Sequence, residues 1–125
     1  MTSDRKEGHT AVADVLNAAA DLLDKPGAWA QGSLALGSSG ESLSVDSSEA
    51  VCFCIVGAIQ RVSGFNRRPE KTVPLRQAVA RSLGLPGYKA PLVAWNDAPE
   101  RTQAEVVQAL RDAARAALSK AKGGG

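Results

Sequence analysis

One stretch of the sequence decides the fold that we predict: DSSEAVCFCIVGAIQRVSG, from Asp46 to Gly64. It has the start and the end of a helix, since Asp46 or Ser48 can accept hydrogen bonds from the first backbone N–H groups and Gly64 suits a left-handed stop. Glu49 stands where the acid of a capping box reaches back. Residues 50–59 include no charged or strongly polar side chain, so no face of this helix suits water. We therefore expect a buried central helix that other elements surround.

The sequence on either side of this stretch predicts three more helices. The first begins at a Thr10 cap and ends at Pro26-Gly27, and its apolar residues are spaced by three and four: Val12, Val15, Leu16, Ala19, Leu22 and Leu23. The next extends from a Thr72 cap to Gly84, and the last begins with the capping box Thr102-Gln-Ala-Glu105. The inward stripe of the last helix is formed by Val106, Val107, Leu110, Ala113, Ala114, Ala117 and Leu118.

Residues 28–45 suit a small hairpin rather than a helix. A Gly-Ser-Ser-Gly turn at residues 37–40 separates two arms with alternating apolar residues, namely Leu34, Leu36, Leu43 and Val45. Residues 90–95 are apolar, and this segment is too short for periodicity to separate a strand from a helical turn. The predicted fold is therefore mainly α with a minor β part: a compact bundle of about four helices around the buried central helix, with a small β-hairpin.

The length of 125 residues predicts one domain with one hydrophobic core. We place this globular domain at residues 9–119, between a disordered N-terminus at 1–8 and a disordered tail at 120–125. The apolar share of 44% and the charged share of 22% are those of a soluble protein. No run approaches the roughly 18 apolar residues that a membrane span needs, and the polar start does not resemble a signal peptide.

Cys52 and Cys54 are the only cysteines in the sequence, which excludes a disulfide framework and favours the cytoplasm. If Cys52 lies near the start of the central helix, the partial positive charge there favours its thiolate, as in nucleophilic cysteines. His9 would be the base, with Asn96 or Asp97 behind it. The alternative is that both cysteines fill the core. Their thiols would point apart on a helix, so we expect no metal site, and nothing in the sequence predicts a cofactor.

The middle of the chain is basic. Residues 61–90 contain one acid, Glu70, and seven bases: Arg61, Arg67, Arg68, Lys71, Arg76, Arg81 and Lys89. A one-sided positive patch suits nucleic acid or an acidic protein. The alternative is that these side chains solvate the outer face of a helix and a loop.

A second candidate site is the polar cluster that follows the apolar segment 90–95. Trp95 would supply a flat wall, while Asn96, Asp97 and Arg101 would offer donors and acceptors at the mouth of a pocket for a ligand or partner. Trp29 and Gln31 would join them if the hairpin folds over the cluster. The structural alternative is that the polar residues stabilise turns, with Arg101 paired to a local acid.

Three motifs resemble a family of small bacterial and phage proteins of unknown function, over about residues 11–117. They are Trp29-x-Gln31-Gly32, then Ala50-Val51-Cys52-x-Cys54 with Gly57-Ala58-Ile59, then Trp95-Asn96-Asp97 followed by Arg101-Thr102 and Glu105-Val106. The resemblance implies a single bacterial or phage-borne domain in the bacterial or host cytoplasm. It implies no activity, cofactor or catalytic residue.

Our leading functional hypothesis is a non-enzymatic binding or inhibitory protein that acts on another protein or a small ligand. A host-directed or anti-defence role extends it, because small phage domains often bind and block. One alternative is a cysteine-dependent hydrolase or transferase that uses Cys52, with His9 as its base. A second alternative is nucleic-acid binding through residues 61–90. An exposed apolar patch on the first or last helix would suit a homodimer, whereas the Ala-rich stripes of these helices also suit packing within the chain.

Overall fold

The computed structural model describes the backbone of residues 3–64 and 69–123, and the side chains of residues 11–64 and 70–119. Over these ranges the fold is mainly α with a minor β part, as predicted. In chain order the elements are α1 (Ser3–Leu23), β1 (Ala35–Gly37), β2 (Ala50–Phe53), α2 (Ile55–Ser63), the 3-10 turn η1 (Pro69–Lys71), α3 (Thr72–Leu83), α4 (Ala90–Asn96) and α5 (Gln103–Gly123). Residues 90–95, which the sequence left undecided, are helical.

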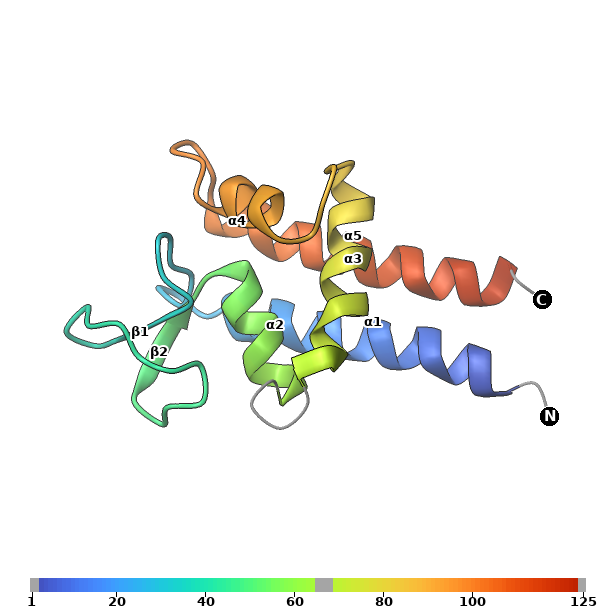
Figure 1. Cartoon of the computed structure of the whole chain (residues 1–125), viewed down its shortest axis with the longest axis horizontal. Coiled ribbons are helices and arrows are strands. Elements are labelled where there is room, and N and C mark those ends of the chain that lie inside the picture. Colours follow the sequence, from blue (N-terminus) through green and yellow to red (C-terminus); the bar gives the residue numbers. More distant parts are fainter. Residues whose placement is uncertain (1–2, 65–68, 124–125) are drawn as a thin grey trace.

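The helices α1 and α5 form an antiparallel pair that runs the length of the molecule (Figure 1). Their apolar stripes face each other, because Leu16, Leu23, Val106 and Leu110 are fully buried. The shorter helices α2 and α3 pack on this pair, α4 packs on α2 and α3, and the two strands lie at the end opposite the termini (Figure 1). No helix in the described part of the chain is both long and apolar enough to cross a membrane.

The start of α5 also closes the end of α1. The side-chain amide of Gln103 donates hydrogen bonds of 2.7 Å to the carbonyl oxygens of Leu23 and Lys25. These carbonyls lie at the C-terminus of α1, where backbone acceptors have no partner inside the helix. The two longest helices are therefore joined by hydrogen bonds as well as by apolar packing.

The predicted central helix is wrong in its first half. Residues 50–53 form strand β2, and α2 begins only at Ile55, with Cys54 as its N-cap in place of Asp46 or Ser48. A short apolar run fits a buried strand and a buried helix equally well, and here pairing with distant segments decides. Strand β2 has partners along both edges, β1 on one side and the chain after α1 on the other.

The burial and the end of the central helix are confirmed. Every residue from Ile55 to Gln60 is buried, and Gly64 ends α2 in the left-handed conformation with φ of 74°. Gly84 ends α3 in the same way. The N-cap of α3 is Lys71, one residue before the Thr72 cap that we predicted.

The hairpin turn forms as predicted, but the strand partner differs. The amide of Gly40 donates to the carbonyl of Gly37 at 3.0 Å, and Leu36 bridges to Ser42 across the turn. The two-stranded antiparallel sheet is nevertheless formed by β1 with β2, and Leu36 lies opposite Cys52. The second arm of the predicted hairpin also pairs with β1, since the amide of Leu43 donates to the carbonyl of Ala35 at 3.0 Å.

The start of α5 was predicted correctly, and the start of α1 was not. The capping box is confirmed: the amide of Glu105 donates to Thr102 Oγ1 at 3.2 Å, and the amide of Thr102 donates to Glu105 Oε1 at 3.0 Å. The Thr10 start is wrong, because α1 begins at Ser3. The division of the chain into a domain at 9–119 and disordered ends stays a prediction.

Gly57 marks the closest approach between α2 and the chain before β1. A methyl group at this position would overlap the carbonyl oxygen of Leu34. That oxygen also accepts a hydrogen bond of 3.3 Å from the amide of Cys54, the N-cap of α2. Glycine at this position therefore allows the sheet to lie directly on the first turn of the buried helix.

We predict that Gly57→Ala destabilises the protein by about 3 kcal/mol or more, because a backbone clash cannot be relieved by a rotamer change. Urea unfolding followed by circular dichroism measures the effect. Gly87→Ala is the matched control, since the added methyl group would make only ordinary contact with Pro91, and it should change stability by less than about 1 kcal/mol. Equal stability of the two variants would contradict the close packing of α2 on Leu34.

Candidate functional site

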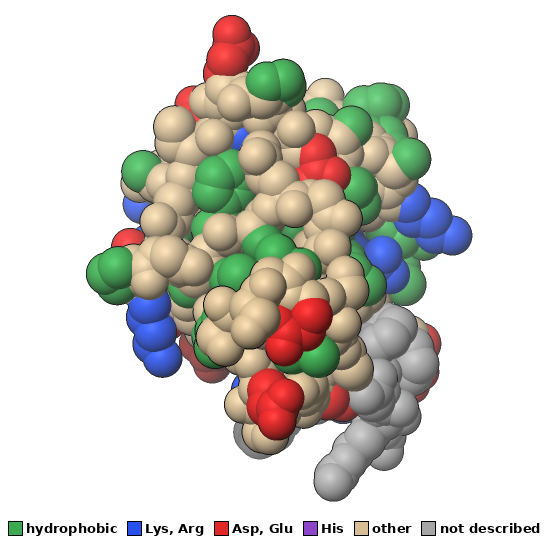
Figure 2. Space-filling view, turned by 90° about the vertical axis from the view of Figure 1, so that its left-hand side faces the viewer, with side chains coloured by type: hydrophobic (Ala, Val, Ile, Leu, Met, Phe, Trp, Pro, Cys, Tyr) green, Lys and Arg blue, Asp and Glu red, His purple; other side chains and the backbone are tan. Residues whose placement is uncertain are grey.

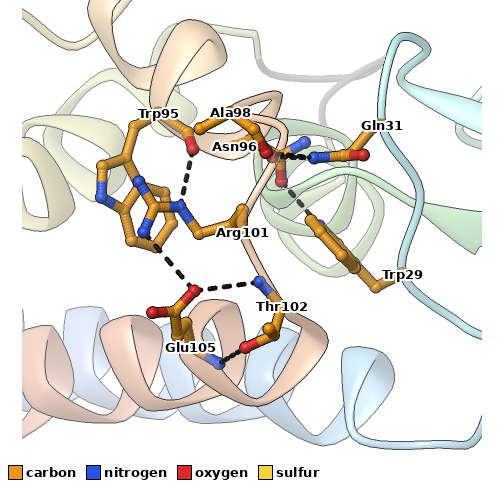
Figure 3. Close-up of polar contacts among 8 residues, drawn as sticks. All are labelled: Trp29, Gln31, Trp95, Asn96, Ala98, Arg101, Thr102 and Glu105. Carbon is orange, nitrogen blue, oxygen red and sulfur yellow. Dashed lines mark hydrogen bonds and ion pairs between the residues drawn. The ribbon is translucent and has the colours of Figure 1, made fainter.

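The six residues of the predicted ligand cluster come together where the chain after α1 meets the end of α4, and Figure 3 shows all of them except Asp97. They are Trp29, Gln31, Trp95, Asn96, Asp97 and Arg101. Trp29 and Gln31 lie across from Asn96, as they would if the hairpin region folded over the cluster. The question is then whether the polar atoms of this cluster face a ligand or bind one another.

The side chain of Asn96 is fully buried at the C-terminus of α4, and all four of its hydrogen-bonding positions are occupied. Oδ1 accepts from the indole Nε1 of Trp29 at 2.8 Å and from the amide of Ile55 at 2.9 Å. Nδ2 donates to the carbonyl of Ala30 at 3.1 Å and to Asp97 Oδ1 at 2.9 Å. Only this orientation of the amide matches two donors with two acceptors. Asn96 therefore has no hydrogen-bonding capacity left for a ligand.

Gln31 and Asp97 form further hydrogen bonds between the chain after α1 and the end of α4, nearer to solvent than those of Asn96. Nε2 of Gln31 donates to the carbonyls of Asn96 at 3.0 Å and Ala98 at 2.8 Å. Asp97 Oδ1 accepts from the amide of Gly32 at 3.1 Å, in addition to its bond with Asn96. Both side chains thus hold the chain after α1 against the loop that follows α4.

Arg101 closes the other side of that loop (Figure 3). Its guanidinium lies 4.0 Å from the centre of the Trp95 ring, and its Nε donates to the Trp95 carbonyl at 2.8 Å. Nη1 lies 3.5 Å from Oε1 of Glu105, the acid of the capping box. Arg101 therefore forms the ion pair with a local acid that the structural alternative predicted. The cluster therefore holds α2, α4 and α5 together.

The premise for a nucleophilic Cys52 is wrong. Cys52 lies half-buried in strand β2, opposite Leu36, and has no helix N-terminus beside it. The cysteine at a helix start is Cys54, whose Sγ accepts a hydrogen bond of 3.3 Å from the amide of Gly57. His9 belongs to α1, but its side chain lies outside the described residues. Its role as a base therefore stays a prediction.

Burial raises the pKa of the Cys54 thiol above its ordinary value. The N–H groups of Gly57 and Val56 favour the thiolate, and the negative charge of Asp97 disfavours it, but loss of water around the sulfur is the largest effect. Cys54 is therefore a neutral thiol at neutral pH. It acts as a helix cap inside the core and not as an activated nucleophile.

The described residues of the predicted basic patch lie on several elements, and a one-sided patch stays a prediction. Arg61 donates from Nη1 to the carbonyls of Val45 and Ser47, both at 2.7 Å, and so holds the loop before β2. Lys71, Arg76, Arg81 and Lys89 lie on η1, α3 and the start of α4. Arg67 and Arg68 lie outside the described residues. On the face at the hairpin end, basic side chains stand apart near the edges, between acidic and uncharged ones (Figure 2).

The structure contains a groove that the sequence did not reveal. It has a volume of about 390 Å³ and lies between α3, α5 and one residue of α1. It is lined by Val12, Pro74, Gln77, Ala78, Arg81, Ser82, Ala113, Ala116 and Ala117. The sequence signal was the alanine stripe of α5, which we assigned to the core. We call this site the α3–α5 groove.

Among the described residues, no group of three or more His, Cys, Asp and Glu side chains lies close enough to hold a metal ion.

Comparison with known proteins gives one result. The model of a single protein family matches residues 7–116, and that family is described as a family of unknown function (DUF6197). No curated protein and no solved structure matches this chain.

We predict that Asn96→Ala costs about 3 kcal/mol or more, because it leaves the Trp29 indole, the Ile55 amide and the Ala30 carbonyl without their partner. Denaturant unfolding with a constant m-value measures this cost. Gln31→Ala is the control, since it removes two hydrogen bonds nearer to solvent and should cost only about 1 kcal/mol. If the Asn96 variant is no less stable than the Gln31 variant, Asn96 is not the structural centre of the cluster.

Alkylation tests the state of the two thiols. In the native protein at about pH 7, iodoacetamide should modify Cys52 first and leave Cys54 unmodified until the protein unfolds, because Cys54 is buried and protonated. Mass mapping of the peptides distinguishes the two sites. Modification of native Cys54 at the rate of Cys52 would contradict this assignment.

The raised pKa of Cys54 also predicts how stability depends on pH. The folded state binds the thiol proton more tightly than the unfolded state, so this contribution to stability is complete below the ordinary thiol pKa of about 8.5 and is lost as the pH rises above it. The difference in unfolding free energy between the wild type and Cys54→Ala should therefore shrink between about pH 8 and pH 10. A constant difference would show that Cys54 does not resist ionisation.

Proposed function

This chain belongs to the family of unknown function whose model it matches, and from this premise we propose that it is a non-enzymatic protein that binds a helical segment of another protein. The binding site is the α3–α5 groove. The observation that carries this proposal is a concave, mostly apolar surface whose single charged lining residue among those described, Arg81, has no partner within the described chain.

The shape of the groove suits a helix. One wall is formed by Ala113, Ala116 and Ala117 of α5, whose small side chains let another helix approach closely. The opposite wall is α3, and its residues Ala78 and Arg81 lie on one face of that helix, three positions apart. An amphipathic helix that lies in such a groove buries its apolar stripe and keeps its polar face in water.

The charge of the groove suits an acidic edge on that helix. Arg81 is exposed and forms no ion pair or hydrogen bond with another described residue. Its neighbours on the same wall, Gln77 and Ser82, are uncharged. A glutamate or aspartate beside the apolar stripe of the partner would meet an unopposed guanidinium, which favours this partner over a basic one.

The cluster around Asn96 is the other candidate site. It favours the α3–α5 groove as the binding site, because its own polar groups already have partners. The Asn96 carboxamide is saturated, and Arg101 is bound to Trp95 and Glu105. Cys54 is a buried neutral thiol. A cysteine-dependent reaction would need a different thiol environment from the ones found here.

We also propose an inhibitory role and a cellular compartment for this protein. A bacterial or phage-borne domain that occupies a helix of its partner would block whatever else binds that helix, which is an inhibitory role. We assign it to the cytoplasm, because both cysteines are free and this suits a reducing compartment.

A pair of synthetic peptides tests the proposal. Both form the same amphipathic helix, and they differ only in carrying either glutamate or lysine beside the apolar stripe. With ¹⁵N-labelled protein, the acidic peptide should shift the amide signals of Ala78, Ala116 and Ala117 in a saturable way, and the basic peptide should not. Equal binding of both peptides, or no saturable shift at the groove with either, would overturn the proposal.

Two variants with one control make the test specific. Arg81→Glu should weaken the acidic peptide at least about tenfold, and Ala116→Phe should abolish its binding because the ring fills the groove. Arg115→Glu is the matched control: Arg115 is exposed on α5 but does not line the groove. This control should bind like the wild type.

A further inference from the structure

A second site of unbalanced positive charge surrounds Tyr88, in the segment that joins α3 to α4. The guanidinium carbon of Arg76 lies 5.3 Å from the centre of the Tyr88 ring, and the ammonium nitrogen of Lys89 lies 5.7 Å from it. Two positive side chains are thus held on one aromatic ring. The attraction of each cation to the face of the ring explains these positions, and it leaves both charges without an anion among the described residues.

Arg76 has fewer partners than the other arginines that lie over aromatic rings in the described chain. Arg61 donates to two carbonyl oxygens, and Arg101 has both a carbonyl and the carboxylate of Glu105. The half-buried Arg76 donates only from Nη2 to Thr72 Oγ1, at 3.1 Å. Its Nε is buried and has no hydrogen-bond partner. Partial burial of a guanidinium without an anion is unfavourable, and here one hydrogen bond and the contact with the Tyr88 ring offset only part of this cost.

The surrounding sequence offers no acid to balance these charges. Glu70 is the single acidic residue between positions 61 and 90. It forms no ion pair with Arg76 or with Lys89, and the ion pairs found in the described chain all involve arginines of α5 or Arg101. Neither cation therefore has an acidic partner among the described residues.

We propose that Arg76, Tyr88 and Lys89 form a binding site for one oxyanion, the phosphate group or carboxylate of a ligand. The guanidinium supplies directed N–H donors, the ammonium group supplies a mobile point charge, and both cations lie within 5.7 Å of the centre of the Tyr88 ring. The bound oxyanion screens the repulsion between the two cations and compensates the charge of Arg76. None of these three residues lines the α3–α5 groove, so this site is independent of the helix-binding function.

Phosphate titration of the full-length protein tests this site. With ¹⁵N-labelled protein at constant ionic strength, inorganic phosphate should shift the Arg76 Nε–H signal and the amide signals of Tyr88 and Lys89, and the shifts should saturate at millimolar concentrations. Shifts that grow linearly with phosphate would reflect salt effects alone and would overturn the proposal.

Charge removal at one exposed residue makes the test independent of folding. Lys89→Gln should weaken phosphate binding at least about tenfold, and because Lys89 is exposed the variant should fold normally. Arg76→Gln should abolish binding. Lys25→Gln is the matched control, since it removes an exposed lysine that does not contact Tyr88. Loss of binding in the control, or unchanged binding in Lys89→Gln, would overturn the assignment.

Two further titrations distinguish the sources of the oxyanion. Acetate that binds with the same dependence on Lys89 assigns the site to carboxylates as well as phosphates, and acetate that fails to bind restricts it to phosphate groups. An oligothymidylate that binds more tightly than inorganic phosphate, and loses this affinity in Lys89→Gln, assigns the phosphate to nucleic acid. Each of these outcomes supports the site and identifies its ligand.

Discussion

The buried carboxamide of Asn96 is the interaction on which the arrangement of three separate segments depends. It joins the chain after α1, the first turn of α2 and the end of α4, because its oxygen and nitrogen bind Trp29, Ile55 and Ala30. A carboxamide in the core is favourable only when all its donors and acceptors are bound, and this condition fixes the positions of its partners. The sheet, α2 and α4 therefore cannot shift independently of one another.

Local features of the sequence predicted three of the helix ends, because each of these depends on a few neighbouring residues. The capping box of Thr102 and Glu105 and the stops at Gly64 and Gly84 formed as expected. The change from strand to helix at Cys54 was not predictable in this way, since its cause lies in hydrogen bonds to residues 28–34. Apolar composition identified this segment as core, but composition does not show which distant segment will pair with it.

The candidate site was likewise predictable only in part. The sequence brought Trp29, Gln31, Asn96, Asp97 and Arg101 into one cluster, and the structure places them together. Whether such residues face a ligand or bind the backbone depends on the direction of each side chain, and a sequence pattern contains no information on direction. The α3–α5 groove was missed for a related reason. An alanine in a helix stripe looks the same in sequence whether another element covers it or leaves a hollow beside it.

The pairing of α1 with α5 has a consequence for synthesis of the protein on the ribosome. The bonds from Gln103 to Leu23 and Lys25 connect positions about 80 residues apart, and the apolar stripe of α1 faces α5 along much of its length. α1 is made long before its partner, so its stripe stays exposed until α5 has left the exit tunnel. Contacts of such long range also slow folding, because closing the loop between them costs chain entropy before any contact forms. An N-terminal half made without α5 therefore lacks the main packing partner of α1.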